Sequence, residues 1–200
     1  MNEERFQKQL SFILELDKEK NIFRQTHLSG HGRRENDAEH AWHMALMIYL
    51  LCEYADTEFD VARAMTMALI HDVVEIDAGD TYAYDAARLS TQKEREAQAA
   101  DRLFGLLPVD QGKDLRALFE EFEANETPEA HFAHAMDNLQ PLLLNHSNGG
   151  SDWKEHDVTA PQVIKRQQTT ALASRELWEY TRTLIDENVR RGSLKSGVED

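Results

Sequence analysis

The chain has 200 residues, of which 41% are hydrophobic, and carries a formal net charge of −15 at pH 7. This length can bury the core of one domain, while the acidic charge argues against the basic face that a general nucleic-acid binder or a protein docked on anionic lipid needs. A small phosphate substrate is not excluded, because a metal ion and one or two arginines can offset the field locally.

The composition predicts an all-α fold, because helix-forming Ala, Leu, Glu, Arg and Gln are abundant while Val, Ile and Thr never run in alternation. Apolar residues recur at helical spacing over about 3–17, 37–55 and 58–76. Between the first two helices, residues 17–37 lose this periodicity and carry the most basic patch of the chain. We predict that this segment is a loop.

Capping and apolar residues predict the later helices at about 91–107, 115–122, 128–144 and 160–189. The third of these has the clearest start, because Thr127-Pro128-Glu129 supplies an N-cap, a proline at the first helical position and an acid favoured by the helix dipole. Asn36 or Asp37 can cap the helix over 37–55 in the same way. Residues 191–200 are predicted to form a polar, loose tail.

The sequence contains no evident targeting segment, repeat or domain linker, so we expect a single domain over residues 1–200. The longest apolar run, residues 41–52, is interrupted by His43 and is too short to span a bilayer. The one cysteine, Cys52, cannot form an internal disulfide, which fits a reducing compartment. We therefore expect a cytoplasmic protein that does not bind membranes.

The most informative stretch is residues 65–80, where an apolar helix ends in a cluster of ionisable groups. Five of them arrive within ten residues: His71, Asp72, Glu75, Asp77 and Asp80. Carboxylates are seldom fully buried unless they are paired or bind a metal. A His–Asp pair at the end of an apolar helix therefore suggests a hydrolytic metal site.

Candidate metal ligands occur beside apolar residues on three predicted helices: His40, His71, Asp72 and Asp137. Taken singly, each has an ordinary alternative as a buried histidine with satisfied hydrogen bonds or as a salt-bridged acid. Two imidazoles and two carboxylates together suit a six-coordinate ion such as Mn, Fe, Co or Mg better than a closed structural Zn site, which prefers thiolates. Such a set leaves two positions open, so the metal could lower the pKa of a bound water and polarise a substrate phosphate.

Two acids near the His–Asp pair could carry protons. Glu75 lies four residues after His71, hence one helical turn along on the same face, and could orient the water or accept its proton. Asp80 follows the turn at Gly79 and could act as the acid for the leaving oxygen or as a second base.

Three blocks of this sequence resemble the HD superfamily of metal-dependent phosphohydrolases, and within it the HD-domain-containing-2 type and the bacterial 5'-deoxynucleotidases. The blocks are residues 34–45 (RENDAEHAWHMA), 69–80 (LIHDVVEIDAGD) and 132–137 (FAHAMD). The resemblance covers about residues 5–185. It implies a single all-α HD domain of about six or seven helices, usually homodimeric, with one divalent metal ion (Mn, Co, Fe or Mg, with Zn as a further candidate).

Carried over position by position, the resemblance implies a set of site residues. The metal ligands would be His40, His71, Asp72 and Asp137, and the catalytic carboxylates would be Glu75 and Asp80. Arg24 falls where the deoxynucleotidases have a phosphate-contacting arginine. Gln25 follows where those enzymes have an aromatic residue near the sugar, and the loop is one residue longer, which leaves the sugar preference open.

We expect Arg24 and Arg33 to bind the phosphate, because a guanidinium group pairs well with phosphate oxygens. Some HD enzymes bind a second metal through extra histidines. His43, His131 and His134 are candidates here, but they complete no second site that we recognise, so we expect one metal.

These observations predict a metal-dependent phosphomonoesterase that removes the 5'-phosphate from a (deoxy)nucleoside monophosphate. Its partners would be a small phosphate ester and a second copy of the chain, with no nucleic-acid polymer. Two alternatives stay open. One is an HD phosphohydrolase of another phosphoester, such as a cyclic nucleotide or a sugar phosphate, and the other is a non-catalytic, metal-stabilised helical interaction domain.

Overall fold

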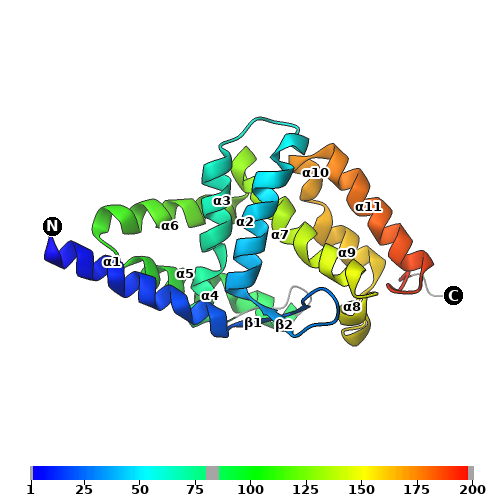
Figure 1. Cartoon of the computed structure of the whole chain (residues 1–200), viewed down its shortest axis with the longest axis horizontal. Helices are drawn as coiled ribbons and strands as arrows, with labels where there is room; N and C mark the ends of the chain where they lie inside the picture. Colours follow the sequence, from blue (N-terminus) through cyan, green and yellow to red (C-terminus); the bar gives the residue numbers. More distant parts are fainter. Residues whose placement is uncertain (1, 80–85, 198–200) are drawn as a thin grey trace.

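The protein is built almost entirely from helices, which confirms the predicted all-α class (Figure 1). The computed structural model describes residues 2–79 and 86–197, with the backbone alone at 86–91. The helices of the first part are α1 (Glu3–Leu16), α2 (Asp37–Leu51), α3 (Val61–Ile70), α4 (Glu75–Ala78) and α5 (Ala86–Phe104). The second part contains α6 (Val109–Ala124), α7 (Pro128–Ser147), α8 (Ser151–Glu155), α9 (Ala160–Gln167), α10 (Thr170–Ala173) and α11 (Arg175–Arg190). Short 3-10 helices lie at η1 (Asp17–Asn21), η2 (Cys52–Tyr54) and η3 (His71–Val74).

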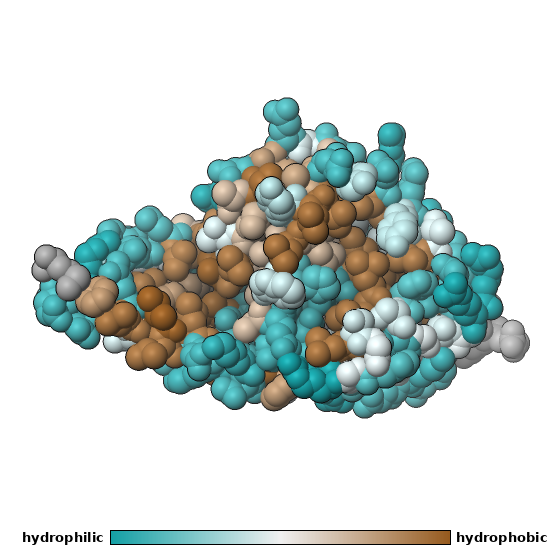
Figure 2. Space-filling view, viewed as in Figure 1, coloured by the Kyte–Doolittle hydropathy of each residue, from teal (hydrophilic) through white to brown (hydrophobic). Residues whose placement is uncertain are grey.

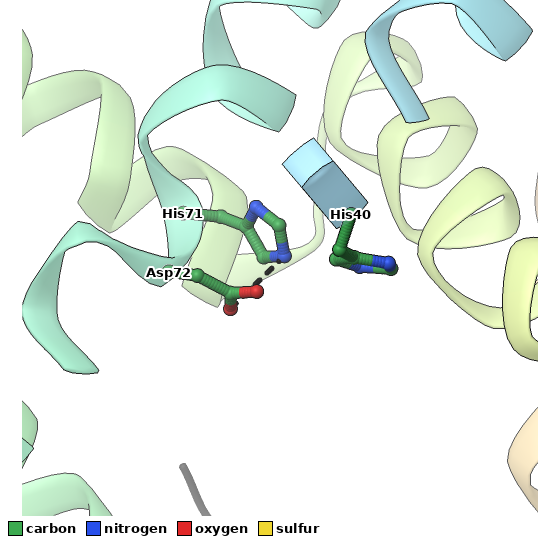
Figure 3. Close-up of side chains that lie close together, drawn as sticks. All are labelled: His40, His71 and Asp72. Atoms are coloured by element: carbon green, nitrogen blue, oxygen red, sulfur yellow. Dashed lines mark ion pairs between the residues drawn. The ribbon is translucent and has the colours of Figure 1, made fainter. Parts of the chain in front are cut away.

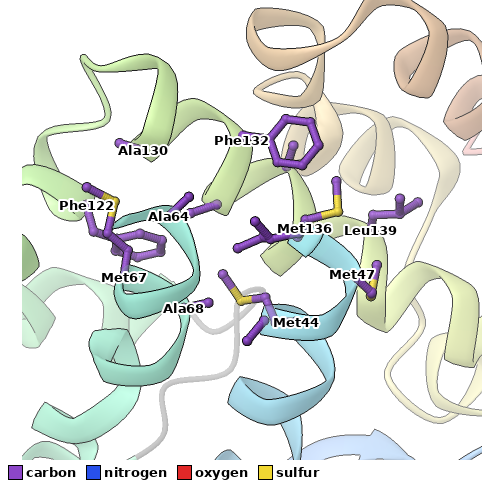
Figure 4. Packing of buried hydrophobic residues seen from close by; sticks show 14 of the residues in the cluster. Met44, Met47, Ala64, Met67, Ala68, Phe122, Ala130, Phe132, Met136 and Leu139 are labelled. Carbon is purple, nitrogen blue, oxygen red and sulfur yellow. The ribbon is translucent and has the colours of Figure 1, made fainter. Parts of the chain in front are cut away.

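The long helix α7 lies at the centre and packs against α2, α3, α6 and α10. In Figure 1, α1, α5 and α6 extend to one side of this centre and α8 to α11 gather on the other. The methionines Met44, Met67 and Met136, from α2, α3 and α7, are fully buried together (Figure 4). The small residues Ala64 and Ala68 face this cluster from α3, and small side chains let neighbouring helices approach closely.

The segment predicted to be a loop differs in the structure. It forms η1 and then a two-stranded antiparallel ribbon of β1 (Phe23–His27) and β2 (Arg34–Asn36), with an irregular register between Phe23 and His27. Asp152, from α8, accepts hydrogen bonds from the backbone and the ring of His27. The loop prediction was wrong because these strands are fixed by partners distant in sequence, whereas their own residues show no apolar alternation.

Two predicted long helices are interrupted. The helix expected over 58–76 ends as α3 at Ile70 and continues as η3 and α4, so His71 lies on a tighter 3-10 turn. The helix expected over 160–189 is divided into α9, α10 and α11. Ser174 has an extended backbone (φ −159°, ψ 119°), and its hydroxyl accepts from the Leu177 N–H at the start of α11. A serine cap ends one helix and begins the next without any glycine or proline to mark the break.

The chain beyond α11 is packed rather than loose as far as it is described. Leu194 is buried, and the backbone carbonyl of Lys195 accepts from the Ala160 N–H at 2.8 Å. This contact joins the end of the chain to the start of α9. Within the described ranges, every helix is too short or too polar to cross a bilayer.

Candidate metal centre

The His71–Asp72 pair is held in η3, directly after the buried helix α3. Both side chains are buried, with Val73 and Val74 beside them. The His71 ring contacts the Ala68 carbonyl oxygen through Nδ1 at 2.8 Å. In the neutral ring this contact places the proton on Nδ1 and leaves Nε2 as an acceptor. That Nε2 lies 3.0 Å from Asp72 Oδ1 (Figure 3).

His40 lies in the first turn of α2, whose start is fixed by a capping box between Asn36 and Glu39. The ring is fully buried, and its Nδ1 lies 3.0 Å from Gln140 Oε1. The amide of Gln140 is oriented by Glu35, which accepts from Nε2 of Gln140 at 2.6 Å. The amide oxygen therefore faces His40, so the neutral ring carries its proton on Nδ1 and presents Nε2 to the cluster.

The structure brings the four predicted ligands together from α2, η3 and α7. Ligand atoms of His40, His71 and Asp72 lie within 4.8 Å of one another, and Figure 3 shows these three side chains lying close together. Asp137 joins them through Oδ1, which lies 3.1 Å from His40 Nε2 and 4.0 Å from His71 Nε2.

Electrostatics keep the two acids of this cluster ionised. Burial by itself would raise the pKa of Asp72, but the charges of His71 and Arg24 outweigh burial and hold that pKa below its ordinary value. Burial likewise opposes ionisation of Asp137, yet contact with His40 and the charge of Arg166 hold its pKa well below the usual range. Burial would lower the pKa of His71, but Asp72 raises it to about 9. The ionised carboxylates therefore stabilise positive charge in this buried space.

These features fit a divalent cation. With both rings neutral, Nε2 of His40 faces a carboxylate oxygen of Asp137, and Nε2 of His71 faces one of Asp72. Two acceptors at about 3 Å repel each other in a buried space unless a shared cation or a proton lies between them. Two imidazole nitrogens and two carboxylates form a mixed donor set that suits Mn, Fe, Co or Mg and also accommodates Zn.

Arg24 extends from β1 into this cluster. Its Nη1 lies 2.6 Å from Asp72 Oδ2 and 3.7 Å from Asp37 Oδ1, and its Nη2 lies 4.0 Å from Asp137 Oδ1. The β1–β2 ribbon, unpredicted from the sequence, therefore places the predicted phosphate-binding arginine beside the metal-type ligands.

A cavity of about 400 Å³ opens onto the cluster. Its walls include Glu75, which is buried at the start of α4, and Gln25, which follows Arg24 on β1. Further lining residues are His71, Asp72, Asp137, Asn138, Trp153 and Arg166. Asp80, the second predicted acid, lies outside the described residues.

Arg33 is not brought to this cavity. Its guanidinium group forms a two-armed pair with Glu39 on the surface, and its side chain is 54% exposed. The candidate second-metal histidines contact other protein groups. His43 Nδ1 lies 3.2 Å from Gln140 Nε2, while His131 and His134 contact the backbone carbonyls of Asn125 and Phe122.

Two residues of the site were not identified from the sequence. Gln140 orients His40, and it lies three residues after Asp137 on the same face of α7. Arg166 lines the cavity from α9. The sequence signal for it was its position three residues after the buried Val163, which places the arginine on the same side of α9 as an apolar residue.

The comparisons agree with the helical fold. The model of the HD domain matches residues 16–178, and the chain belongs to this family. The chain is similar to a crystal structure described as a predicted metal-dependent phosphohydrolase from Magnetospirillum magnetotacticum. The two are 52% identical, with a TM-score of 0.93, and the match covers 96% of this chain and 97% of that one.

Curated relatives match part of the chain. The human 5'-deoxynucleotidase HDDC2 is 31% identical over 111 residues, which is 56% of this chain and 53% of that protein. The 5'-deoxynucleotidase hdd1 of Schizosaccharomyces pombe is 27% identical over 118 residues, 56% of this chain and 58% of that protein. The chain therefore spans about half the length of the curated relatives that it matches. The fold is shared with a conserved hypothetical protein from Pyrococcus furiosus. The two are 23% identical with a TM-score of 0.59, and the match covers 90% of this chain and 99% of that one.

Proposed function

We propose that this HD-domain protein is a metal-dependent phosphohydrolase that removes the 5'-phosphate from (deoxy)nucleoside monophosphates. The observation that carries the proposal is the meeting of two imidazole nitrogens and two ionised carboxylates at one edge of a 400 Å³ cavity. Pockets of this size are typical of small-molecule sites. The substrate class is supported by relatives named 5'-deoxynucleotidases.

In this proposal His40, His71, Asp72 and Asp137 hold one divalent metal ion. The bound ion supplies Lewis-acid activation of water and of the phosphate group. Arg24, already positioned beside Asp72, orients the phosphate by charge-assisted hydrogen bonds. Arg24 and Gln25 both line the cavity, which supports a role for both residues in contacting the substrate.

Hydrolysis forms a bond from the water oxygen to phosphorus and breaks the ester bond to the 5'-oxygen. Glu75, on the cavity wall one turn beyond His71, accepts the proton of the attacking water. Asp80 gives a proton to the leaving 5'-oxygen. The products are inorganic phosphate and the nucleoside, and no oxidant or second substrate is required.

A second copy of the chain is the proposed macromolecular partner. Large apolar side chains are exposed on α1 and α2, and the space-filling view shows apolar surface over both helices (Figure 2). They include Ile13, Leu14, Trp42, Tyr49 and Leu50. An apolar face can pair with its own copy about a twofold axis without any charge mismatch, in keeping with the usual state implied by the family resemblance.

The test of the activity is phosphate release by the metal-loaded chain from a panel of nucleoside 5'-monophosphates, cyclic nucleotides and sugar phosphates. We expect turnover of 5'-monophosphates that a chelator abolishes. Glu75→Gln should lower kcat about 100-fold or more, because general acid–base groups contribute about 10²–10⁴. Asp77→Asn is the matched control, since Asp77 lies two residues away but pairs with Arg102. A loaded, folded protein that cleaves no 5'-monophosphate contradicts the proposal.

A further inference from the structure

We propose that Arg166 is a second phosphate-binding residue and that, with Arg24, it selects a dianionic phosphomonoester. The inference rests on the proposed phosphohydrolase function and specifies its substrate class. Arg24 and Arg166 are the two arginine or lysine side chains among the described residues that line the cavity. They reach Asp137 at different oxygens: Arg24 Nη2 lies 4.0 Å from Oδ1, and Arg166 Nη2 lies 3.7 Å from Oδ2.

The helix α9 explains why Arg166 faces the cavity. Val163, one turn earlier, is buried and also lines the cavity, so the spacing of three residues places Arg166 over the same wall. The next residue, Gln167, fastens the end of α9 to α7 by donating from Nε2 to the Asn138 carbonyl oxygen at 2.6 Å. By contrast, Lys165 is exposed and does not line the cavity.

The two arginines differ in how many carboxylates already lie close to their guanidinium groups. Arg24 is nearly buried and has four carboxylates within 4.0 Å of its nitrogen atoms. The side chain of Arg166 is 30% exposed and pairs with Asp137 at 3.7 Å, and among the described residues it makes no hydrogen bond. A guanidinium group carries five N–H donors in a planar fork that matches phosphate oxygens. Arg166 therefore has donors available for a ligand in the cavity.

The charge of the ligand follows from this arrangement. The cavity wall is rich in acids, so an anion is held only if several positive charges oppose them. A phosphomonoester carries about −1.5 to −2 charges at pH 7 and presents three terminal oxygens. A phosphodiester or cyclic nucleotide has one negative charge and fewer free oxygens, so a second guanidinium group stabilises it less. Arg166 thus favours the monoester over the diester.

The experiment measures binding separately from turnover. Isothermal titration calorimetry of the full chain with Mg²⁺ gives the dissociation constants of inorganic phosphate and of dimethyl phosphate, a monoanionic diester. We expect Arg166→Gln to weaken phosphate binding by about 10-fold or more, the usual scale for loss of a charged hydrogen bond, and to weaken dimethyl phosphate binding less. Lys165→Gln, which removes the same charge from the neighbouring exposed position, should leave both constants within about twofold.

Kinetics give a second readout. For a nucleoside 5'-monophosphate, Arg166→Gln should raise KM by a similar factor with a smaller change in kcat, the pattern of a lost binding contact. If Arg166→Gln has a low melting temperature, Arg166→Met, which keeps the unbranched aliphatic part of the side chain, is measured in its place. The inference is overturned if a folded Arg166 variant binds phosphate as tightly as the wild type, or if Lys165→Gln weakens binding equally. It is also overturned if the Arg166 variant loses affinity equally for phosphate and dimethyl phosphate, or if the wild type binds no phosphate.

The outcomes also separate this inference from the proposed activity. A wild-type protein that cleaves nothing but binds phosphate in an Arg166-dependent way contradicts the proposed function and supports the binding role. A wild-type protein that hydrolyses 5'-monophosphates while Arg166→Gln keeps its KM and its phosphate affinity supports the function and overturns the binding role.

Discussion

Replacing Gln140 by leucine tests whether a buried amide controls the metal affinity of His40. Gln140 Oε1 lies 3.0 Å from His40 Nδ1, and its Nε2 donates to Glu35 Oε1 at 2.6 Å. Leucine has a similar volume but no polar atoms, so His40 and Glu35 each lose a partner in a buried site. Each group left unsatisfied costs about 1–3 kcal/mol, so we expect the free energy of unfolding to fall by about 2–6 kcal/mol.

Metal affinity is the more specific readout. Without the amide oxygen, the proton of the neutral His40 ring is no longer held on Nδ1, and Nε2 is a poorer ligand. Loss of such an orienting partner typically weakens metal affinity by about 10–100-fold. Competition with a chromophoric chelator measures the affinity, and thermal unfolding of the metal-free protein measures the stability.

A matched control comes from the other end of α7. There His146 contacts Asn188 of α11, a buried amide whose Nδ2 lies 3.0 Å from the His146 ring nitrogen. This is also an amide–imidazole contact, although here the amide nitrogen faces the ring, and it lies away from the predicted ligands. Asn188→Leu should lower stability without changing metal affinity. If folded Gln140→Leu binds metal as tightly as the wild type, then Gln140 does not set the His40 tautomer or His40 is not a ligand, and the reasoning is refuted.

Two further predictions concern pH and assembly. Burial raises the pKa of Glu19 to about 7, so the folded state binds its proton more tightly than the unfolded chain, and stability is lost as pH rises from 4.5 through 7. Glu19→Gln should therefore stabilise the protein by up to about 3 kcal/mol at pH 8, since one pKa unit is about 1.4 kcal/mol. At pH 4 the gain should be small. Urea unfolding measures both values, and an equal gain at both pH values contradicts this prediction. Trp42→Glu should convert the proposed dimer to a folded monomer in analytical ultracentrifugation, because a charge in each copy would be buried at the proposed interface. An unchanged sedimentation coefficient argues against that face.

The sequence predicted those helices whose signals are local. Two predicted helix starts agree with the structure: α2 begins at the Asn36 cap with Glu39, and α7 begins at the Thr127 cap with Pro128. These starts were predictable because a cap and the N–H groups that it binds lie within one turn. The β1–β2 ribbon and the break at Ser174 were not predicted. The ribbon is held against α8 by Asp152, which is distant in sequence, and a serine caps a helix only where packing makes the chain turn.

The sequence by itself determined the family, the helical class and the residue types of the candidate centre, since these follow from composition and from motifs read along the chain. Only the tertiary structure decided which side chains meet. It places Arg24 at Asp72, pairs Arg33 with Glu39 on the surface, and brings Arg166 from α9 to the cavity. The physical reason is that helical periodicity fixes which residues share a face, whereas the packing of α7 against its neighbours decides where each face points.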